Sequence, residues 1–346
     1  MDAATTTSTA YDNATAQFLS NLVGLAYAQF DNPAWNGDIP ADQVPTGYTQ
    51  IAKFQVPNLD VDKAVDAFLA AHPELQPLVS TDVAALADAE AQALNTQLSN
   101  ALEDPATLTA ITAAAAPPQG LADSAPTWFG FALAPTSDNL TGSNIVAYRG
   151  TRTVTEWGID ATAVQVPVPL AWFSDGKLKF ARMHLGFLIL FAFLKPQVDA
   201  AVKQFNPNAA STQVAGHSLG GAITTVTSIY LKLGSLFTPL QSYTLASPRV
   251  GDSTFVSAYN FFVPSTFRIV NLSDLVPILP PTSLTIVVRG VTVSVQYAHV
   301  GQEWSYLWQT GDVGDNHGWQ INYNPATIAN VPTSAARTYP NSGIPC

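Results

Sequence analysis

Residues 213–225, which read QVAGHSLGGAITT, decide the fold that this sequence predicts. An apolar run ends at Gly216, and Ser218 is followed by a glycine pair and then by small and β-branched residues that can form a helix. This is the pattern G-x-S-x-G, which bends a strand sharply into a helix and pushes the serine hydroxyl out of the bend. A side chain at Gly216 or Gly220 would press against the crossing backbone, so glycine is expected at both positions.

Size and charge limit the classes of protein to which the chain can belong. At 346 residues and 47% hydrophobic content, folding removes about three quarters of the extended chain's surface from water, enough for a large core without disulfide or metal support. The net charge is −11, with 14 Lys and Arg and no basic cluster, which argues against nucleic acid and anionic membranes as partners. The only cysteine is Cys346, so no internal disulfide can form.

Neither a leader nor a membrane span is predicted. The first residues, MDAATTTSTAYDNATA, lack a basic stretch followed by an apolar one, so they do not form a secretory leader. Either the protein is cytoplasmic or the sequence begins after a removed leader, and we favour secretion. The longest uncharged apolar run, residues 185–194, is far shorter than a bilayer requires and predicts a buried helix.

Hydrophobic periodicity divides the chain into a helical first part and an alternating second part. A helix is predicted over residues 11–30 and a strand over 48–56, and the alanine-rich segment 59–116 predicts a helical insertion or cap. Further on, strands are predicted over 127–133, 144–148, 211–215, 242–246 and 267–271, helices over 182–205, 218–233 and 252–263, and a hairpin over 285–297. Strands that alternate with helices indicate a mostly parallel sheet covered on both faces.

A serine on such a bend needs a base, and the base needs an acid that orients it. In hydrolases with this bend the chain order is serine, acid, histidine. Asp274 lies just past the predicted strand 267–271, at the edge where open α/β sheets carry their functional groups. The alternative is an aspartate that caps a turn or a helix. Asp252 opens a predicted helix and is better explained as a cap.

Two histidines, His299 and His317, follow both the serine and the later strands. His299 lies on or just after a β run and could form a structural hydrogen bond, whereas His317 lies in a predicted polar loop, DNHGW, of the kind that can present an imidazole over a sheet edge. Spacing alone does not choose between them. His217 is better explained as a brace for the bend, and His184 as a core histidine at the head of an apolar helix.

An oxyanion requires two donors at the place where negative charge develops, and losing one typically costs about 2.7 to 4 kcal/mol of barrier. The N–H of Leu219, the first residue after the serine, can supply one of them. The second is expected from residues 148–151, where Thr151 also offers its hydroxyl.

Seven motifs in this order resemble the class 3 lipases, the filamentous-fungal type lipase family. The motifs are AYRGT (147–151), EW followed by Asp160, HLGF (184–187), AGHSLGGA (215–222), SPRVGD (247–252), VNLSDLVPILPP (270–281) and YAHVGQE (297–303). The resemblance spans about residues 11–323.

The resemblance implies a role for each candidate residue. Ser218 is then the nucleophile, Asp274 the acid, and Thr151 with Leu219 the oxyanion hole. In this family the histidine of Y-x-H-x-G-x-E is not the base, which comes later in the chain, so the resemblance favours His317.

The same family places a short lid just after the oxyanion loop. Here the lid is expected at residues 153–161, with Val154, Trp157 and Ile159 as apolar positions. Such a stripe usually belongs to a core. In a lid it would cover the serine in water and lie against lipid when open.

The sequence therefore predicts a single α/β-hydrolase domain over residues 1–346 that contains the helical insertion 59–116. The resemblance implies a lipase, in the first place a triacylglycerol lipase, that cleaves lipid esters at an oil–water interface through an acyl-enzyme, without a metal or organic cofactor. A phospholipase, a galactolipase or a soluble-ester carboxylesterase would share every motif. A non-catalytic lipid-binding protein is disfavoured because the triad and oxyanion positions are all present.

Overall fold

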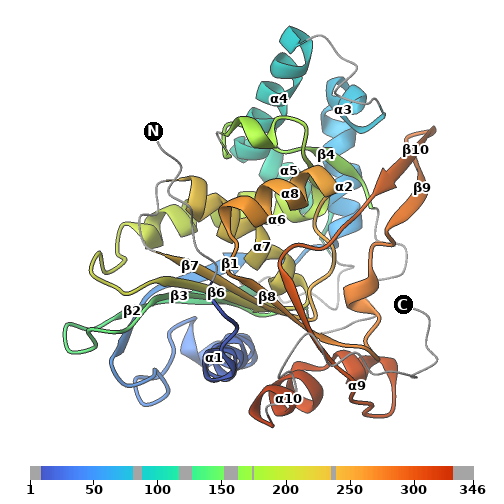
Figure 1. Cartoon of the computed structure of the whole chain (residues 1–346). Helices are drawn as coiled ribbons and strands as arrows, with labels where there is room; N and C mark the ends of the chain where they lie inside the picture. The colour runs from blue at the N-terminus through green and yellow to red at the C-terminus, as the bar shows by residue number, and fades with distance from the viewer. Residues whose placement is uncertain are drawn as a thin grey trace.

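A central sheet forms the middle layer of the molecule, as the computed structural model shows for residues 9–80, 88–116, 127–151, 163–173, 175–234 and 239–329. Within these ranges the sheet has seven strands in the order β1-β2-β3-β6-β7-β8-β11 (Figure 1). The strands are β1 (Tyr48–Val56), β2 (Thr127–Pro135), β3 (Asn144–Tyr148), β6 (Thr212–His217), β7 (Leu240–Leu245), β8 (Thr266–Asn271) and β11 (Gln302–Tyr306).

The sheet is mostly parallel, as predicted. The first three strands are antiparallel neighbours, and every later pair, from β3 with β6 to β8 with β11, is parallel. Strands β3, β6 and β8 are buried along their whole length, as expected for strands of a sheet that is covered on both faces. The carboxyl ends of the parallel strands share one edge of the sheet.

Helices cover both faces of this sheet, so the fold is that of an α/β-hydrolase (Figure 1). On one face lie α1 (Asn13–Asp31) and the short α10 (Asn324–Ile328), which lie side by side and are joined by a hydrogen bond from Ser20 Oγ to Asn324 Oδ1 (2.8 Å). On the other face lie α6 (Leu185–Val202), α7 (Leu219–Leu233) and α8 (Ser253–Phe262).

The segment 59–116 forms helices, as predicted, and they pack outside α6. They are α2 (Val61–Ala71), α3 (Gln76–Ser80), α4 (Asp88–Glu103) and α5 (Pro105–Ala114). The N–H of Asp60 donates to the carbonyl oxygen of Ala115 (3.0 Å), which brings the two ends of the insertion together. Phe68 and Leu102 share one hydrophobic core with Phe191 of α6. That residues 1–346 form a single domain stays a prediction.

Helix α6 begins three residues later than the sequence predicts. Residues Arg182–His184 form β5, which pairs with β4 (Gln165–Pro167), and the ring of His184 then caps the helix by accepting from Gly186 N–H at Nδ1 (3.1 Å). By length and composition α6 could cross a membrane, but 61% of it is buried inside this structure, where it contacts β1, α2 and α7.

Between residues 283 and 323 the structure confirms the predicted hairpin and differs from the prediction at β11 (Gln302–Tyr306) and around His317. The hairpin formed by β9 (Ser283–Val288) and β10 (Val291–Gln296) turns at Arg289 and Gly290, both with positive φ. Strand β11 was not predicted. The polar stretch with His317 is not a loop but a short helix, α9 (Val313–His317), because Asp312 caps it by accepting from Asp315 N–H (2.7 Å). A π-helical turn, η7 (Trp319–Tyr323), follows.

Candidate active site

Ser218 lies on the bend between β6 and α7 with a backbone conformation that side chains rarely adopt. Its φ is 57° and its ψ is −125°. A Cβ at Gly216 would lie 2.2 Å from the carbonyl oxygen of Gly220, and a Cβ at Gly220 would lie 2.4 Å from that of Arg149. Both glycines are therefore required by the bend, and the strain at Ser218 is held by the packing around it.

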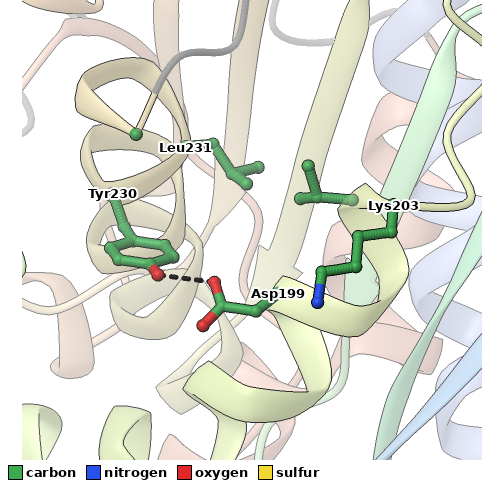
Figure 2. Close-up of a pocket in the computed structure, with 6 residues that line it drawn as sticks. Asp199, Lys203, Tyr230 and Leu231 are labelled. Carbon is green, nitrogen blue, oxygen red and sulfur yellow. Dashed lines mark hydrogen bonds between the residues drawn. The ribbon is translucent and has the colours of Figure 1, made fainter.

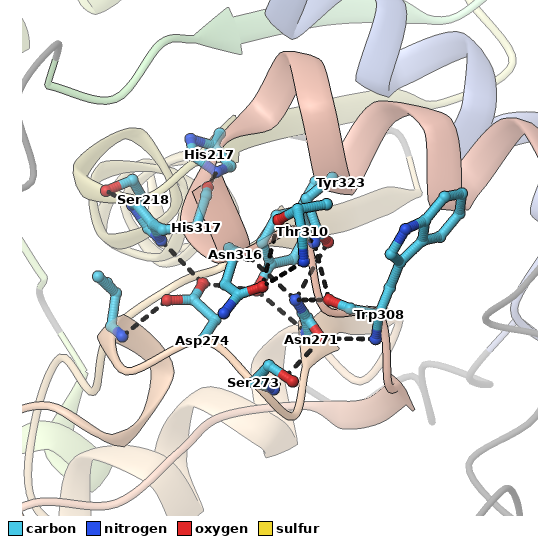
Figure 3. A network of polar contacts seen from close by, with 12 residues as sticks. His217, Ser218, Asn271, Ser273, Asp274, Trp308, Thr310, Asn316, His317 and Tyr323 are labelled. Atoms are coloured by element: carbon cyan, nitrogen blue, oxygen red, sulfur yellow. Dashed lines mark hydrogen bonds and ion pairs between the residues drawn. The ribbon is translucent and has the colours of Figure 1, made fainter. Parts of the chain in front are cut away.

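The side chains of Ser218, His317 and Asp274 meet at the carboxyl edge of the sheet (Figure 3). Ser218 Oγ lies 2.8 Å from His317 Nε2, and His317 Nδ1 lies 2.8 Å from Asp274 Oδ2. A carboxylate can only accept, so Nδ1 carries the ring proton and Nε2 accepts from the serine hydroxyl. All three side chains are buried. This arrangement can draw the proton from the hydroxyl when the oxygen attacks an electrophile.

Three donors surround the buried carboxylate of Asp274. They are His317 Nδ1–H, the hydroxyl of Tyr323 (2.7 Å to Oδ2) and the N–H of Val276 (2.9 Å to Oδ1). Burial and the charge of Asp274 raise the pKa of Tyr323 well above its ordinary value, so the phenol keeps its proton and remains a donor. These donors compensate for the loss of water around the negative charge.

Asn271, the last residue of β8, supports the segment that carries His317 (Figure 3). Its Nδ2 donates to the carbonyl oxygens of Asn316 (3.0 Å) and Trp308 (2.8 Å), and its Oδ1 accepts from the N–H of Trp308 (3.1 Å). One strand end therefore positions both the acid, three residues on, and the backbone just before the base.

The remaining histidines near the site are structural. His217 lies between two groups, with Nδ1 2.8 Å from the hydroxyl of Tyr27 and Nε2 2.8 Å from the carbonyl oxygen of His317. Burial and the neighbouring His317 hold the pKa of His217 well below its ordinary value. His299 donates from Nε2 to the carbonyl oxygen of Pro277 (2.6 Å), and burial holds its pKa well below the ordinary value too. The structure therefore brings His317, and not His299, to Ser218.

The two predicted oxyanion positions flank the serine. Leu219 is the first residue of α7, where the backbone N–H groups have no partner within the helix. On the other side, Gly150 packs so closely against the serine that an added Cβ would lie 2.7 Å from Ser218 Cβ. Thr151 is the next residue along the chain. That Thr151 and Leu219 form an oxyanion hole stays a prediction.

The predicted lid residues Val154, Trp157 and Ile159 fall within 152–162 and lie outside the described residues. Among the residues that are described, no three His, Cys, Asp or Glu side chains gather as metal ligands would.

A cavity of about 320 Å³ lies away from the triad, at the carboxyl ends of α6 and α7 (Figure 2). It is lined by Asp199, Val202, Lys203, Tyr230, Leu231 and Gly234. The hydroxyl of Tyr230 donates to Asp199 Oδ1 (2.5 Å), and Lys195 Nζ lies 3.3 Å from the other carboxylate oxygen. Asp199 is thus already paired, and no triad residue lines this cavity.

Comparison with known proteins finds relatives for the central part of the chain. The family described as Lipase (class 3) matches residues 145–284, a range that includes Ser218 and Asp274 but not His317. A secreted mono- and diacylglycerol lipase 1 of Fusarium solani is 32% identical over 148 residues, which cover 42% of this chain and 41% of that protein. A phospholipase A1-II 3 of Oryza sativa is 28% identical over 163 residues, which cover 40% and 39%.

A solved structure with similarity is that of the Rhizomucor miehei triacylglyceride lipase. It is 27% identical, with a TM-score of 0.40, and the match covers 51% of this chain and 61% of that one. The chain spans less than half the length of the two curated relatives above.

Proposed function

We propose that this chain, whose residues 145–284 belong to the class 3 lipase family, hydrolyses carboxylic esters of acylglycerols with Ser218 as its nucleophile. The observation that carries the proposal is the continuous hydrogen-bonded chain from Ser218 Oγ through the ring of His317 to Asp274, with both contacts at 2.8 Å. A buried hydroxyl at a strained bend, paired with an oriented imidazole, matches the needs of acyl transfer.

The reaction takes place in two halves. Ser218 Oγ attacks the ester carbonyl while His317 takes the hydroxyl proton at Nε2, and Asp274 stabilises the imidazolium. The negative charge on the carbonyl oxygen is met by the N–H of Leu219 and by Thr151. When the intermediate collapses, His317 gives the proton to the departing alcohol, which leaves an acyl-enzyme. Water, activated by the same ring, then releases the fatty acid and restores the serine.

Acylglycerols are the proposed substrate class, with triacylglycerol first among them. The names of the fungal relatives support acylglycerols, whereas the name of the rice relative supports a phospholipase A1 as the second candidate. These candidate substrate classes can be separated by a panel of emulsified triacylglycerol, diacylglycerol, phospholipid, galactolipid and short-chain soluble esters. Turnover of phospholipid far above turnover of acylglycerol would replace the first candidate with the second.

A serine-directed phosphonate tests the chemistry itself. We expect one covalent adduct, located at Ser218 by peptide mass spectrometry, and complete loss of esterase activity. The Ser218→Ala variant is the matched control and should take up no label. A folded protein that gains no adduct at Ser218 would contradict the proposal and favour a non-catalytic lipid-binding protein.

Action at an oil–water interface and secretion are further parts of the proposal. The apolar positions Val154, Trp157 and Ile159 support a lid, and the Fusarium solani relative is named as secreted. The rate should rise abruptly where the substrate exceeds its solubility limit, and a smooth rise through that limit would contradict a lid. Secretion predicts that the protein accumulates in the culture medium of its source.

A further inference from the structure

Tyr27, on helix α1, connects two parts of the candidate active site that are far apart in the sequence. Its hydroxyl lies 2.8 Å from His217 Nδ1 and accepts from the N–H of Gly150 (3.0 Å). His217 in turn contacts the carbonyl oxygen of His317 through Nε2 (2.8 Å). The hydroxyl of Tyr27 therefore links the predicted oxyanion loop, residues 148–151, to the backbone of the proposed base His317.

The donor and the acceptor can be assigned in each of the three hydrogen bonds that link Gly150, Tyr27, His217 and the backbone of His317. The carbonyl oxygen of His317 only accepts, so His217 Nε2 carries a proton. Burial and the neighbouring His317 hold the pKa of His217 well below its ordinary value, so its Nδ1 carries no proton and accepts from the Tyr27 hydroxyl, whose oxygen accepts from the N–H of Gly150. His217 is then a neutral ring with both nitrogens engaged, which leaves His317 as the ring that can receive a proton from Ser218.

The peptide group between Gly150 and Thr151 is also held from the side of α1. Arg149 Nη1 donates to the carbonyl oxygen of Gly150 (2.6 Å), and the guanidinium of Arg149 lies over the ring of Phe30, 4.0 Å from its centre. Because the N–H and C=O of a trans peptide point in opposite directions, this contact turns the N–H of Thr151 away from the guanidinium. Tyr27 and Arg149 thus fix the two sides of Gly150.

The hydroxyl of Tyr27 is not what docks α1 onto the sheet. Trp319 Nε1 donates to the carbonyl oxygen of Ser20 (3.0 Å), Ser20 Oγ donates to Asn324, and Leu19 and Leu22 are buried in the core on that face. The polar end of Tyr27 is therefore directed at the site, while other residues of α1 supply the packing.

We propose that Tyr27 is a positioning residue that fixes the base His317 and the oxyanion loop at Gly150 relative to each other, acting through His217. This inference rests on the proposed ester hydrolase function. Tyr27 lies outside the residues that the class 3 lipase family matches. The proposal therefore gives helix α1, at the N-terminal end of the described chain, a part in the chemistry as well as in the fold.

The test is Tyr27→Phe, which removes the hydroxyl and keeps the ring. Removing one direct oxyanion donor lowers kcat by about 10²- to 10³-fold, so a residue one step removed should lower it by about 10-fold or more. KM should change by less than about twofold, because Tyr27 supports groups that act in the transition state. Active sites are counted by phosphonate titration, so that kcat refers to correctly folded protein.

A matched control is Tyr243→Phe. The hydroxyl of Tyr243 accepts from the N–H of Asp12 at the other end of α1 (3.4 Å), and its ring is buried in the same core. This variant should keep the kcat of the parent protein. If Tyr27→Phe stays within twofold of the parent kcat, matches Tyr243→Phe, or changes KM alone, the proposal is wrong.

His217→Gln keeps a side-chain N–H that can reach the carbonyl oxygen of His317 but changes the acceptor for Tyr27, and it should also lower kcat with little effect on KM. It carries the test on its own if Tyr27→Phe does not fold, and an unchanged kcat would then overturn the proposal. In the double variant, the combined loss should be smaller than the product of the single losses, because both changes break one chain. A Ser218→Ala protein that still turns over ester would overturn the proposed function instead.

Discussion

The side-chain amide of Asn271 donates a hydrogen bond to the backbone carbonyl of Asn316, 3.0 Å away, and so ties the end of β8 to the residue before His317. Asp274 follows Asn271 by three residues on the same turn. The acid and the base are therefore positioned from one strand end, although they are 43 residues apart in the sequence.

Replacing Asn271 with alanine should damage both stability and rate. The variant leaves several buried polar groups without their partner, so the free energy of unfolding should fall by about 2 to 4 kcal/mol. The kcat should fall by about 10-fold or more, because the segment with His317 loses its anchor. Urea unfolding and active-site-normalised kinetics measure the two effects.

Asn144→Ala is the matched control for that experiment. Asn144 is also a buried asparagine at a strand end, where it exchanges hydrogen bonds with the backbone of Asn206 (3.0 and 2.8 Å). It is the first residue of β3, however, and so lies at the amino ends of the parallel strands, opposite the triad. It should lose stability and keep its kcat. Equal rate losses in the two variants would show that Asn271 acts only through general stability.

Two histidine substitutions should behave in opposite ways. Ser218→Ala and His317→Ala should each lower kcat by about 10⁴-fold or more, since the members of a triad act as a unit. His299→Ala should leave kcat nearly unchanged in protein that remains folded, because the ring donates to Pro277 and not to the serine. Circular dichroism establishes folding, and a soluble ester assay measures the rate. Loss of activity in His299→Ala with retention in His317→Ala would reverse the assignment.

The bend at Ser218 predicts a sharp difference between two glycines. A methyl group at Gly216 would lie 2.2 Å from the carbonyl oxygen of Gly220, whereas one at Gly176 would meet nothing within 4 Å. Gly216→Ala should cost about 3 kcal/mol or more, because backbone must move. Gly176→Ala should stay within about 0.5 kcal/mol of the parent. Urea unfolding curves decide, and a Gly216→Ala protein as stable as the parent would contradict the tight bend.

Mild acid should destabilise the protein through its buried histidines. Burial lowers the pKa of His184 to about 3. Burial is also the main reason why the pKa values of His217 and His299 lie well below the ordinary value. The unfolded chain, with ordinary histidine pKa values of about 6.5, then binds protons that the folded chain refuses, so stability falls as the pH drops below about 7. Each group should cost on the order of 1 kcal/mol between pH 7.5 and 5.5, so the three together should cost a few kcal/mol.

His184→Asn isolates one of these contributions. An asparagine oxygen can replace Nδ1 as the acceptor for the N–H of Gly186, but it does not ionise. The variant should therefore lose about a third of the stability difference between pH 7.5 and 5.5, as measured by urea unfolding at both values. A parent protein whose stability does not change between those values would contradict the neutral state of the buried rings.

Local patterns were enough to predict the bend and much of the sheet. The glycines around Ser218 act over a few residues, and Asp274 follows the rule that functional groups lie at the carboxyl ends of strands. Spacing left the choice between His299 and His317 open, and the family resemblance, not a local pattern, favoured His317. The strand that separates the two histidines in space, β11, was not predicted. Because β11 runs parallel to β8, the chain after it emerges at the edge that carries Asp274, and His317 lies after β11 whereas His299 lies before it. A strand prediction over QEWSY would have supplied that signal.

The supporting residues could not be found in this way. Tyr27 and Tyr323 belong to no motif, and the motif VNLSDLVPILPP gives Asn271 no role of its own. Each of the three acts through a side chain whose partner is distant in the sequence. Tyr27, for example, is 190 residues from His217. Such contacts are set by how α1, β8 and η7 pack together, which residue spacing does not encode. The lid residues Val154, Trp157 and Ile159 remain predictions.

The contact between α1 and α10 affects when the candidate active site can assemble during synthesis of the protein. Ser20 and Asn324 are joined across 304 positions, and contacts between such remote segments form slowly because a long loop must close first. During synthesis the hydroxyl of Ser218 and the carboxylate of Asp274 emerge from the ribosome well before the imidazole of His317. Under the proposed mechanism, a nascent chain without His317 has no base for Ser218, so hydrolysis would begin only after the C-terminal helices have docked beside α1.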